Sequence, residues 1–156
     1  MDKCLFGVDK LVFLGFVVSS KGVHVDESKI NAITTWPQPT NLQQVRSFLG
    51  LAGFYRRFVK DFSTIASPLH ALSKKNAPFV WGPSQDTAFN ELKNLLTHAP
   101  LLALPNFDKP FEIHCDASGY DIGGLLMQEK RPIAYFSEKL SRVQLNYLIY
   151  DKVLYV

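Results

Sequence analysis

Asp116 is the residue in this sequence best suited to metal-dependent chemistry. It ends an apolar run, residues 111–115, and Ala117-Ser118-Gly119 follows it. A carboxylate in this position is a candidate ligand for Mg²⁺, which prefers oxygen donors. Phosphodiester cleavage by two metal ions needs several converging carboxylates, so one aspartate is not a complete site. A turn-forming role for Asp116 is the alternative.

Two arginines and two glycines form a second candidate site, for nucleic acid. On a helical wheel Arg46, Gly50, Gly53 and Arg57 fall within an arc of about 60°. A glycine inside a helix costs about 1 kcal/mol relative to alanine, which suggests that another group approaches the backbone closely. That group can be a duplex minor groove, with the arginines on phosphates and Phe54 on sugars. A close helix–helix crossing is the alternative.

A third candidate is Phe13-Leu14-Gly15-Phe16, an aromatic pair around a glycine. Aromatic and β-branched residues surround it, so we expect it in a β-hairpin. Its side chains either pack in the core or belong to a loop that presses on a nucleic-acid backbone.

Hydrophobic periodicity predicts an α+β fold that positions these residues. The apolar spacing changes from a strand pattern to a helical period of about 3.6, and to alternation after residue 110. We expect a β-hairpin from strands at 10–18 and 23–25, then helices at 29–36, 42–59, 63–72 and 83–99. A three-strand antiparallel meander follows at 111–116, 122–128 and 132–136, and one partial helix begins at Leu140. Asp26 and either Thr40 or Asn41 are the expected N-caps.

The composition is that of a folded chain of 156 residues, enough for one ordinary domain or two small ones. Hydrophobic residues make up 47% and charged residues 20%, which excludes a disordered charged tail. Two cysteines, Cys4 and Cys115, are too few for a disulfide framework, and no Cys/His spacing is typical of zinc. No apolar run reaches the roughly 18 residues of a membrane span, and the first residues do not form a signal peptide. We therefore expect an intracellular chain, in the cytoplasm or nucleus, that is not secreted.

Positive charge is concentrated in the middle of the chain. The whole chain has a net charge of +3, but residues 36–82 hold six basic residues against one acidic residue. The basic residues are Arg46, Arg56, Arg57, Lys60, Lys74 and Lys75, and the acidic residue is Asp61. Such a segment indicates a polyanionic partner, and a solvated helix face with unbalanced charge is the alternative.

Five stretches in this order resemble the polymerase polyprotein of plant Ty3/gypsy retrotransposons. They are KLVFLGFVVS (10–19), VRSFLGLAGFYRRF (45–58), APLL (99–102), FEIHCDASG (111–119) and PIAYFSEKL (132–140). The resemblance implies a reverse-transcriptase palm-end hairpin and short helix at 1–36 and thumb/connection helices at 37–107. It further implies a truncated ribonuclease H-like domain at 108–156, with the three-strand meander and the partial helix.

The resemblance also implies roles for the candidate residues. Residues 13–16 match the primer grip, and Arg46, Gly50 and Phe54 match the thumb-helix track along the template–primer minor groove. Asp116 matches the first catalytic carboxylate of ribonuclease H. The Tyr-x-Asp-Asp polymerase motif is absent from the sequence, and Val153 occupies the position where the family has its catalytic glutamate. We expect no firm cofactor, and Mg²⁺ only if this site were completed.

The leading hypothesis is a retrotransposon-derived reverse transcriptase/ribonuclease H fragment, catalytically inactive alone. It would bind RNA–DNA hybrid or duplex DNA weakly and without sequence specificity, and it would not bind membranes. One alternative is a co-opted interaction module that docks a host protein or self-associates through an exposed sheet edge. The other is a part of an active RNA-directed DNA polymerase/ribonuclease H in a longer polyprotein.

Overall fold

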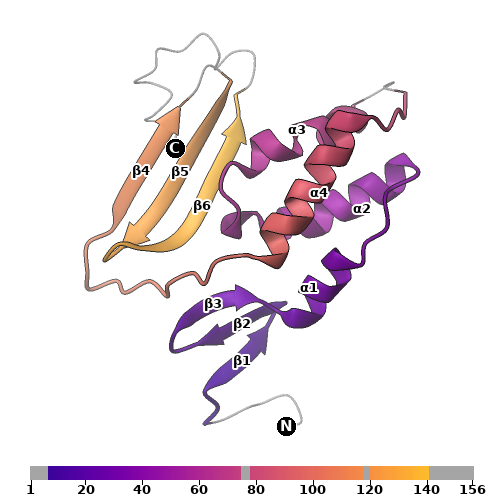
Figure 1. The fold of residues 1–156 in the computed structure, drawn as a ribbon. Helices are drawn as coiled ribbons and strands as arrows, with labels where there is room; N and C mark the ends of the chain where they lie inside the picture. Colours follow the sequence, from indigo (N-terminus) through magenta and orange to yellow (C-terminus); the bar gives the residue numbers. More distant parts are fainter. Residues whose placement is uncertain (1–6, 75–77, 118–119, 141–156) are drawn as a thin grey trace.

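The computed structural model describes residues 7–74, 78–117 and 120–140 (Figure 1). Within these residues it has two antiparallel three-stranded sheets, and the α-helices lie between them in the sequence. This arrangement confirms the expected α+β class. No helix in the described part of the chain has the length and apolar character needed to cross a membrane.

The first sheet contains one strand more than the expected hairpin. Its strands are β1 (Lys10–Phe13), β2 (Phe16–Ser19) and β3 (Gly22–Val25), paired in the order β1-β2-β3. A tight turn at Leu14 and Gly15, with φ of 51° and 81°, divides the run predicted as one strand. Positive φ at two successive residues is the geometry that joins twisted antiparallel strands. Leu14 is not a typical turn residue, so the sequence pattern predicted one continuous strand over residues 10–18.

Two of the helices, α1 and α2, begin at the expected caps. α1 (Glu27–Thr34) follows Asp26, whose carboxylate accepts a hydrogen bond from the Ser28 amide. α2 (Leu42–Phe54) follows Asn41, whose side chain accepts from the Gln44 amide at 3.0 Å. α3 (Phe62–Leu72) and α4 (Pro83–Thr97) complete the helical part. A side-chain acceptor satisfies an amide that has no partner inside the first turn of a helix.

The helix predicted over residues 42–59 is shorter in the structure. α2 ends at Phe54, Tyr55 takes φ −96° and ψ 10°, and a 3₁₀ helix, η1 (Arg56–Phe58), follows. The apolar repeat continues past the end of α2 because Tyr55, Phe58 and Val59 are still buried in the same core. Periodicity therefore reported burial correctly at a place where the backbone is no longer α-helical.

One hydrophobic core joins the four helices to β3. The Phe48 and Phe89 rings of α2 and α4 lie 4.6 Å apart between centroids at its centre. The fully buried residues with the largest side chains in this core are Ile33, Phe48, Tyr55, Phe58, Leu69, Leu92, Leu96 and Leu102. The buried residues of α2 and α4 recur at three- and four-residue spacing, which places them on one face of each helix, as an amphipathic helix requires.

The second sheet is the predicted meander. β4 (Glu112–Ala117), β5 (Asp121–Gln128) and β6 (Arg131–Lys139) pair antiparallel in the order β4-β5-β6. α3 lies alongside β6 (Figure 1), where the Ser63 amide donates to Ser137 Oγ at 2.9 Å and Ser63 Oγ donates to the Ser137 carbonyl at 2.7 Å. The helix predicted from Leu140 onward falls almost wholly outside the described residues.

The segment between α4 and β4 connects the two sheets. Leu102 exchanges two backbone hydrogen bonds with Val23 of β3, at 2.8 and 2.9 Å. The next amide, Ala103, donates to the Pro132 carbonyl at the start of β6, at 2.7 Å. Both sheets are thus fixed to the same stretch of chain.

Candidate nucleic-acid interface

The α2 face predicted to meet nucleic acid is open. Arg46 and Gly50 are exposed and Gly53 is half-buried. A Cβ atom placed on either glycine would meet no neighbouring heavy atom within 4 Å. The helix–helix crossing offered as the alternative is therefore wrong for the described part of the chain, since a crossing would bring a neighbour against these positions. The two glycines keep a strip of α2 backbone accessible instead.

The β1–β2 turn is fixed to the end of α2. Phe13 and Leu14 project outward, 58% and 71% exposed, so core packing does not explain them. The Gly15 carbonyl accepts hydrogen bonds from the Tyr55 hydroxyl and the Asp26 amide, both at 3.1 Å. A Cβ on Gly15 would lie 2.6 Å from the Tyr55 hydroxyl oxygen, so only glycine fits here.

Aromatic rings join the turn to the helix. The Phe16 ring stacks on Phe54 at 5.1 Å between centroids and meets Tyr55 edge-on at 5.4 Å. Phe54 is 50% exposed, which leaves much of its side chain available to a partner. The structure thus brings together two segments, residues 13–16 and α2, that were predicted separately as nucleic-acid contacts.

Arg57 does not continue the Arg46–Gly50–Gly53 row as the wheel predicted. It lies on η1 beyond the end of α2, and its guanidinium carbon sits 5.7 Å from the centroid of the Phe16 ring. A cation–π contact at an exposed site contributes about 0.5–1 kcal/mol. Arg57 therefore lies at the surface beside the β1–β2 turn, where it lines a groove that Gly53 and Phe54 also line.

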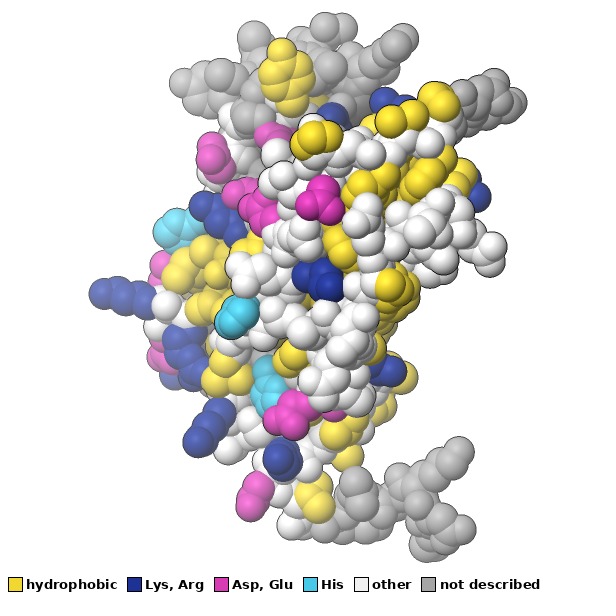
Figure 2. Space-filling view, turned by 45° about the vertical axis from the view of Figure 1, so that its right-hand side comes forward, with side chains coloured by type: hydrophobic (Ala, Val, Ile, Leu, Met, Phe, Trp, Pro, Cys, Tyr) yellow, Lys and Arg dark blue, Asp and Glu magenta, His cyan; other side chains and the backbone are white. Residues whose placement is uncertain are grey.

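A groove extends the interface from α2 to the second sheet. Its volume is about 480 Å³. One wall consists of Gly53, Phe54, Arg56 and Arg57, and the other consists of residues of β4, β5 and β6. Arg56 is exposed, and only the folded chain shows that it faces this groove. Figure 2 shows one face of the molecule, on which Lys and Arg side chains lie among hydrophobic side chains that reach the surface.

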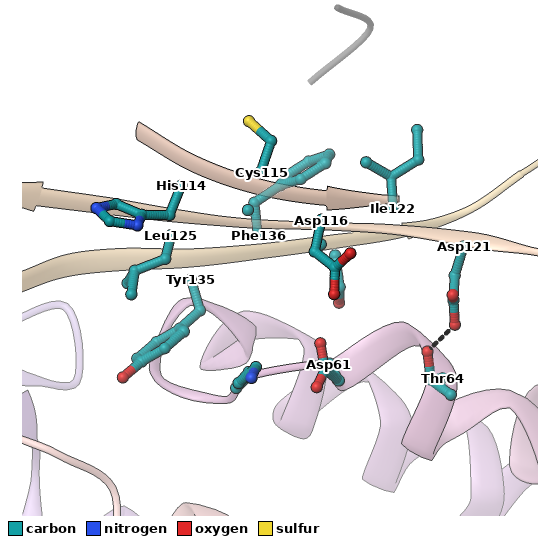
Figure 3. Close-up of a pocket in the computed structure, with 14 residues that line it drawn as sticks. Asp61, Thr64, His114, Cys115, Asp116, Asp121, Ile122, Leu125, Tyr135 and Phe136 are labelled. Atoms are coloured by element: carbon teal, nitrogen blue, oxygen red, sulfur yellow. Dashed lines mark hydrogen bonds between the residues drawn. The ribbon is translucent and has the colours of Figure 1, made fainter. Parts of the chain in front are cut away.

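Asp116 faces a separate pocket between the second sheet and α3. The pocket has a volume of about 320 Å³, and in it the Asp116 side chain points toward Asp61 (Figure 3). Asp61 precedes α3 with φ 55°, and the Thr64 hydroxyl beside it donates to the Asp121 carboxylate. Sequence patterns gave no sign that Asp61 and Asp116 would face each other.

The described residues do not provide the ligand set expected for two-metal cleavage. Among residues 7–74, 78–117 and 120–140, no three His, Cys, Asp or Glu side chains form a group that could hold a metal ion. Two-metal chemistry needs such a convergence of carboxylates. Val153, at the position expected for the family's glutamate, lies outside the described residues. No catalytic step through Mg²⁺ follows from this geometry.

Known proteins match almost the whole length of this chain. Residues 81–156 match the model of the RNase H-like domain found in reverse transcriptase. The Pol polyprotein of the Drosophila melanogaster transposon gypsy is 38% identical over 165 residues, which cover 98% of this chain. The corresponding protein of transposon opus is 33% identical over 167 residues, or 97% of the chain. The chain is homologous to a segment of retrotransposon Pol polyproteins. It spans only 16% and 17% of the lengths of these two relatives.

Solved structures agree with this assignment. A foamy viral protease–reverse transcriptase in complex with RNA/DNA hybrid superposes with a TM-score of 0.83 at 26% identity. The superposition covers 94% of this chain and 21% of the viral one. A second structure of that viral protein, in complex with double-stranded DNA, gives a TM-score of 0.82 over 95% of this chain and 32% of its own. This chain therefore has the fold of the matching part of the foamy viral protein.

Proposed function

We propose that this chain is a nucleic-acid-binding segment of a retrotransposon reverse transcriptase/ribonuclease H. It holds a duplex, either RNA–DNA hybrid or DNA, along the open face of α2. The observation that carries the proposal is the accessible backbone strip at Gly50 and Gly53 beside exposed Arg46. The viral structures in complex with RNA/DNA hybrid and with double-stranded DNA support it.

Each part of the interface has a physical role in this proposal. Arg46 pairs with a phosphate, while the glycine strip lets a sugar–phosphate backbone approach the helix. The exposed Phe54 ring lies against sugars at the edge of the groove. Residues 13–16, fixed to α2 through Tyr55, position the end of one strand as a primer grip. In this proposal the set contacts phosphates, sugars and the nucleic-acid backbone, so binding is independent of sequence.

The division of the chain belongs to the same proposal. Residues 1–36 form the end of a palm, residues 37–107 form the thumb and connection, and residues 108–156 form a ribonuclease H-like domain. In a longer polyprotein these parts would serve an active polymerase. By itself the chain binds weakly, because the α2 face and the groove offer few phosphate contacts.

Two substitutions on α2 separate charge from backbone approach. We expect Arg46→Ala to weaken binding of duplexes of any sequence and to reduce the slope of log K against log salt by about 0.9. Lys29→Ala removes an equal charge from α1 and should leave the slope unchanged. Gly50→Leu should weaken binding with no change in slope, because it blocks approach without removing charge. Asn94→Leu, at an exposed position of α4, is its matched control.

Fluorescence anisotropy at several salt concentrations measures the affinity and the salt slope of all four variants. Circular dichroism confirms that each variant is folded. The proposal fails if Gly50→Leu binds as tightly as Asn94→Leu, or if Arg46→Ala leaves the slope unchanged. The basic segment would then be only a solvated face.

Catalysis is expected to be absent from the isolated chain. Purified protein should not cleave an RNA–DNA hybrid with Mg²⁺ or Mn²⁺, because the described residues do not supply a convergent metal-binding group. Asp116→Asn is the control. Cleavage that appears in the parent chain and disappears in this variant would contradict the expectation. Primer extension above a mock preparation would equally contradict the expected lack of polymerase activity.

A protein-interaction role is the second candidate. It rests on β4, which pairs with β5 alone among the described strands and exposes Ile113 by 67%. An open edge strand can pair with another chain. A second copy of this chain or a host protein would fit this edge.

A further inference from the structure

We propose that a second surface, at the end of the molecule where three loops meet, binds single-stranded nucleic acid. The loops are the turn between α4 and β4, the β5–β6 turn and the β2–β3 turn. We call this the Phe107 surface. It consists of Lys21, Phe107, Lys109, Phe111, Lys130 and Arg131. It shares no residue with the α2 face, so either site can fail without the other.

Side-chain contacts hold the three loops together. Lys109 forms an ion pair with Glu129 of the β5–β6 turn, with 2.6 Å between Nζ and Oε1. Arg131, just after that turn, donates from its guanidinium to the Lys21 carbonyl of the β2–β3 turn at 2.7 Å. Residues that lie 110 positions apart in the sequence are thus brought to one surface.

Phe107 projects from a rigid loop. Its side chain is 85% exposed, the largest exposure given for a large hydrophobic residue in the described chain. The loop is nevertheless fixed by Gln128, which is only 5% exposed. Gln128 accepts from the Asn106 amide at 2.8 Å and donates to the Asn106 and Lys109 carbonyls at 2.8 and 3.1 Å. A ring carried on a backbone that is already held in place needs less ordering when a ligand stacks on it.

The two rings and the surrounding charge suit an unpaired strand. Phe107 and Phe111 lie 5.9 Å apart between centroids and are tilted by 57°, so each offers a face to a different base. The three loops carry four cations against the carboxylates of Asp108 and Glu129. Single-strand sites combine aromatic platforms with basic residues that follow the backbone. Bases inside a duplex stack on one another and cannot reach a protruding ring, so an unpaired segment is the occupant that fits.

The β5–β6 turn adds an independent observation. Glu129 and Lys130 both have positive φ, 50° and 61°, where asparagine and glycine are normally found. Non-glycine residues in this region are strained, and such strain concentrates at functional sites. The turn therefore retains a charged residue, Lys130, at a position where a glycine would fold more easily.

Anisotropy measurements on the full chain test the proposal, with oligothymidylate and oligouridylate of about 15 nucleotides and a blunt duplex hairpin as probes. We expect Phe107→Ala to weaken single-strand binding at least about fivefold, which is the lower end of what stacking one base on an aromatic ring contributes. Val80→Ala, another exposed apolar residue, is the control and should change it less than twofold. Comparing the affinities of the two oligonucleotides shows whether the surface distinguishes a DNA strand from an RNA strand.

Lys130→Gly distinguishes binding from folding. Glycine relieves the positive φ, so the melting temperature should rise. The slope of single-strand affinity against salt should fall by about 0.7, the value per phosphate neutralised on a single strand. A variant that is more stable yet binds more weakly cannot owe its weaker binding to unfolding.

Four results would overturn the proposal. One is that Phe107→Ala binds single strands as tightly as Val80→Ala. A second is that the parent chain does not bind single strands. Another is that Arg46→Ala weakens single-strand binding as much as Phe107→Ala, which would place single strands on the α2 face. The last is that Phe107→Ala changes only self-association in sedimentation, which would assign the Phe107 surface to a protein contact.

Discussion

The Tyr55 hydroxyl is the hydrogen-bond link between the β1–β2 turn and the end of α2. Tyr55 is 1% exposed and donates to the Gly15 carbonyl at 3.1 Å. Tyr55→Phe keeps the ring contacts with Phe16 and removes only this bond, so the free energy of unfolding should fall by about 1 kcal/mol. Urea denaturation measures the change. Tyr135→Phe is the control, because its hydroxyl has no hydrogen bond to the described residues. Equal losses in both variants would contradict the assignment.

Tyr55 also makes the stability dependent on alkaline pH. Burial, and to a lesser extent the negative charge of Asp26, raise the pKa of Tyr55 above its ordinary value of 10.0. Above pH 10 the unfolded chain begins to lose this proton while the folded chain keeps it. The contribution of Tyr55 to stability is therefore complete below pH 10 and decreases as the pH rises beyond it. Denaturation curves between pH 9 and 11 should show a smaller alkaline loss for Tyr55→Phe than for the parent.

The open face of α2 makes a prediction about the helix as an element. Gly50→Ala and Gly53→Ala should each raise the free energy of unfolding by about 0.5–1 kcal/mol, since alanine favours the helix and meets no neighbour. Gly15→Ala is the contrasting variant and should destabilise the protein, because φ is +81° and the Tyr55 hydroxyl occupies the space. Thermal and urea unfolding measure both the expected gain in the α2 variants and the expected loss in Gly15→Ala. A loss of stability in Gly50→Ala would show that another group covers this face.

β4 makes a prediction about sheet edges. Its outer edge has no partner strand among the described residues, and Ile113 is 67% exposed on it. We expect concentration-dependent association through this edge, and Ile113→Lys should weaken it because a lysine on an edge strand opposes pairing. Sedimentation velocity over a range of concentrations measures this. Val80→Lys, with the same charge change in a loop, should not affect association. A parent chain that stays monomeric throughout would rule out the edge as a docking site.

At the scale of the whole molecule, Ser63 and Ser137 fix the second sheet to α3. Ser137 is 8% exposed, and its hydroxyl accepts from the Ser63 amide in the first turn of α3. Ser137→Ala leaves that amide without its partner and should cost about 1–2 kcal/mol. Hydrogen exchange should become faster along β6 and at the start of α3. Ser67→Ala, which removes only a surface bond from Lys139, is the control. Unchanged exchange in Ser137→Ala would show that other contacts hold the sheet.

The predictions from sequence succeeded where the signal is local. Apolar spacing located α2, α4 and the second sheet, and Asp26 and Asn41 capped their helices, because these features depend on neighbouring residues along the chain. They failed where a local pattern is ambiguous. The turn at Leu14 was not predicted, because leucine is not a typical turn residue. Tyr55, Phe58 and Val59 are buried beyond the end of α2, so the helical spacing of apolar residues continues where the helix does not.

The sequence alone predicted the α+β class and the resemblance to retrotransposon Pol polyproteins, and it supplied the residues that face nucleic acid in the proposal. Only the tertiary structure showed that the glycines of α2 are uncovered, that residues 13–16 lie against its end and that Asp61 faces Asp116. Only the folded chain brings together the three loops that form the Phe107 surface, because they lie far apart in the sequence. The physical reason is that helical and strand periods record how much each residue is buried. What covers a given residue depends on contacts between distant segments, and these follow from packing the whole chain.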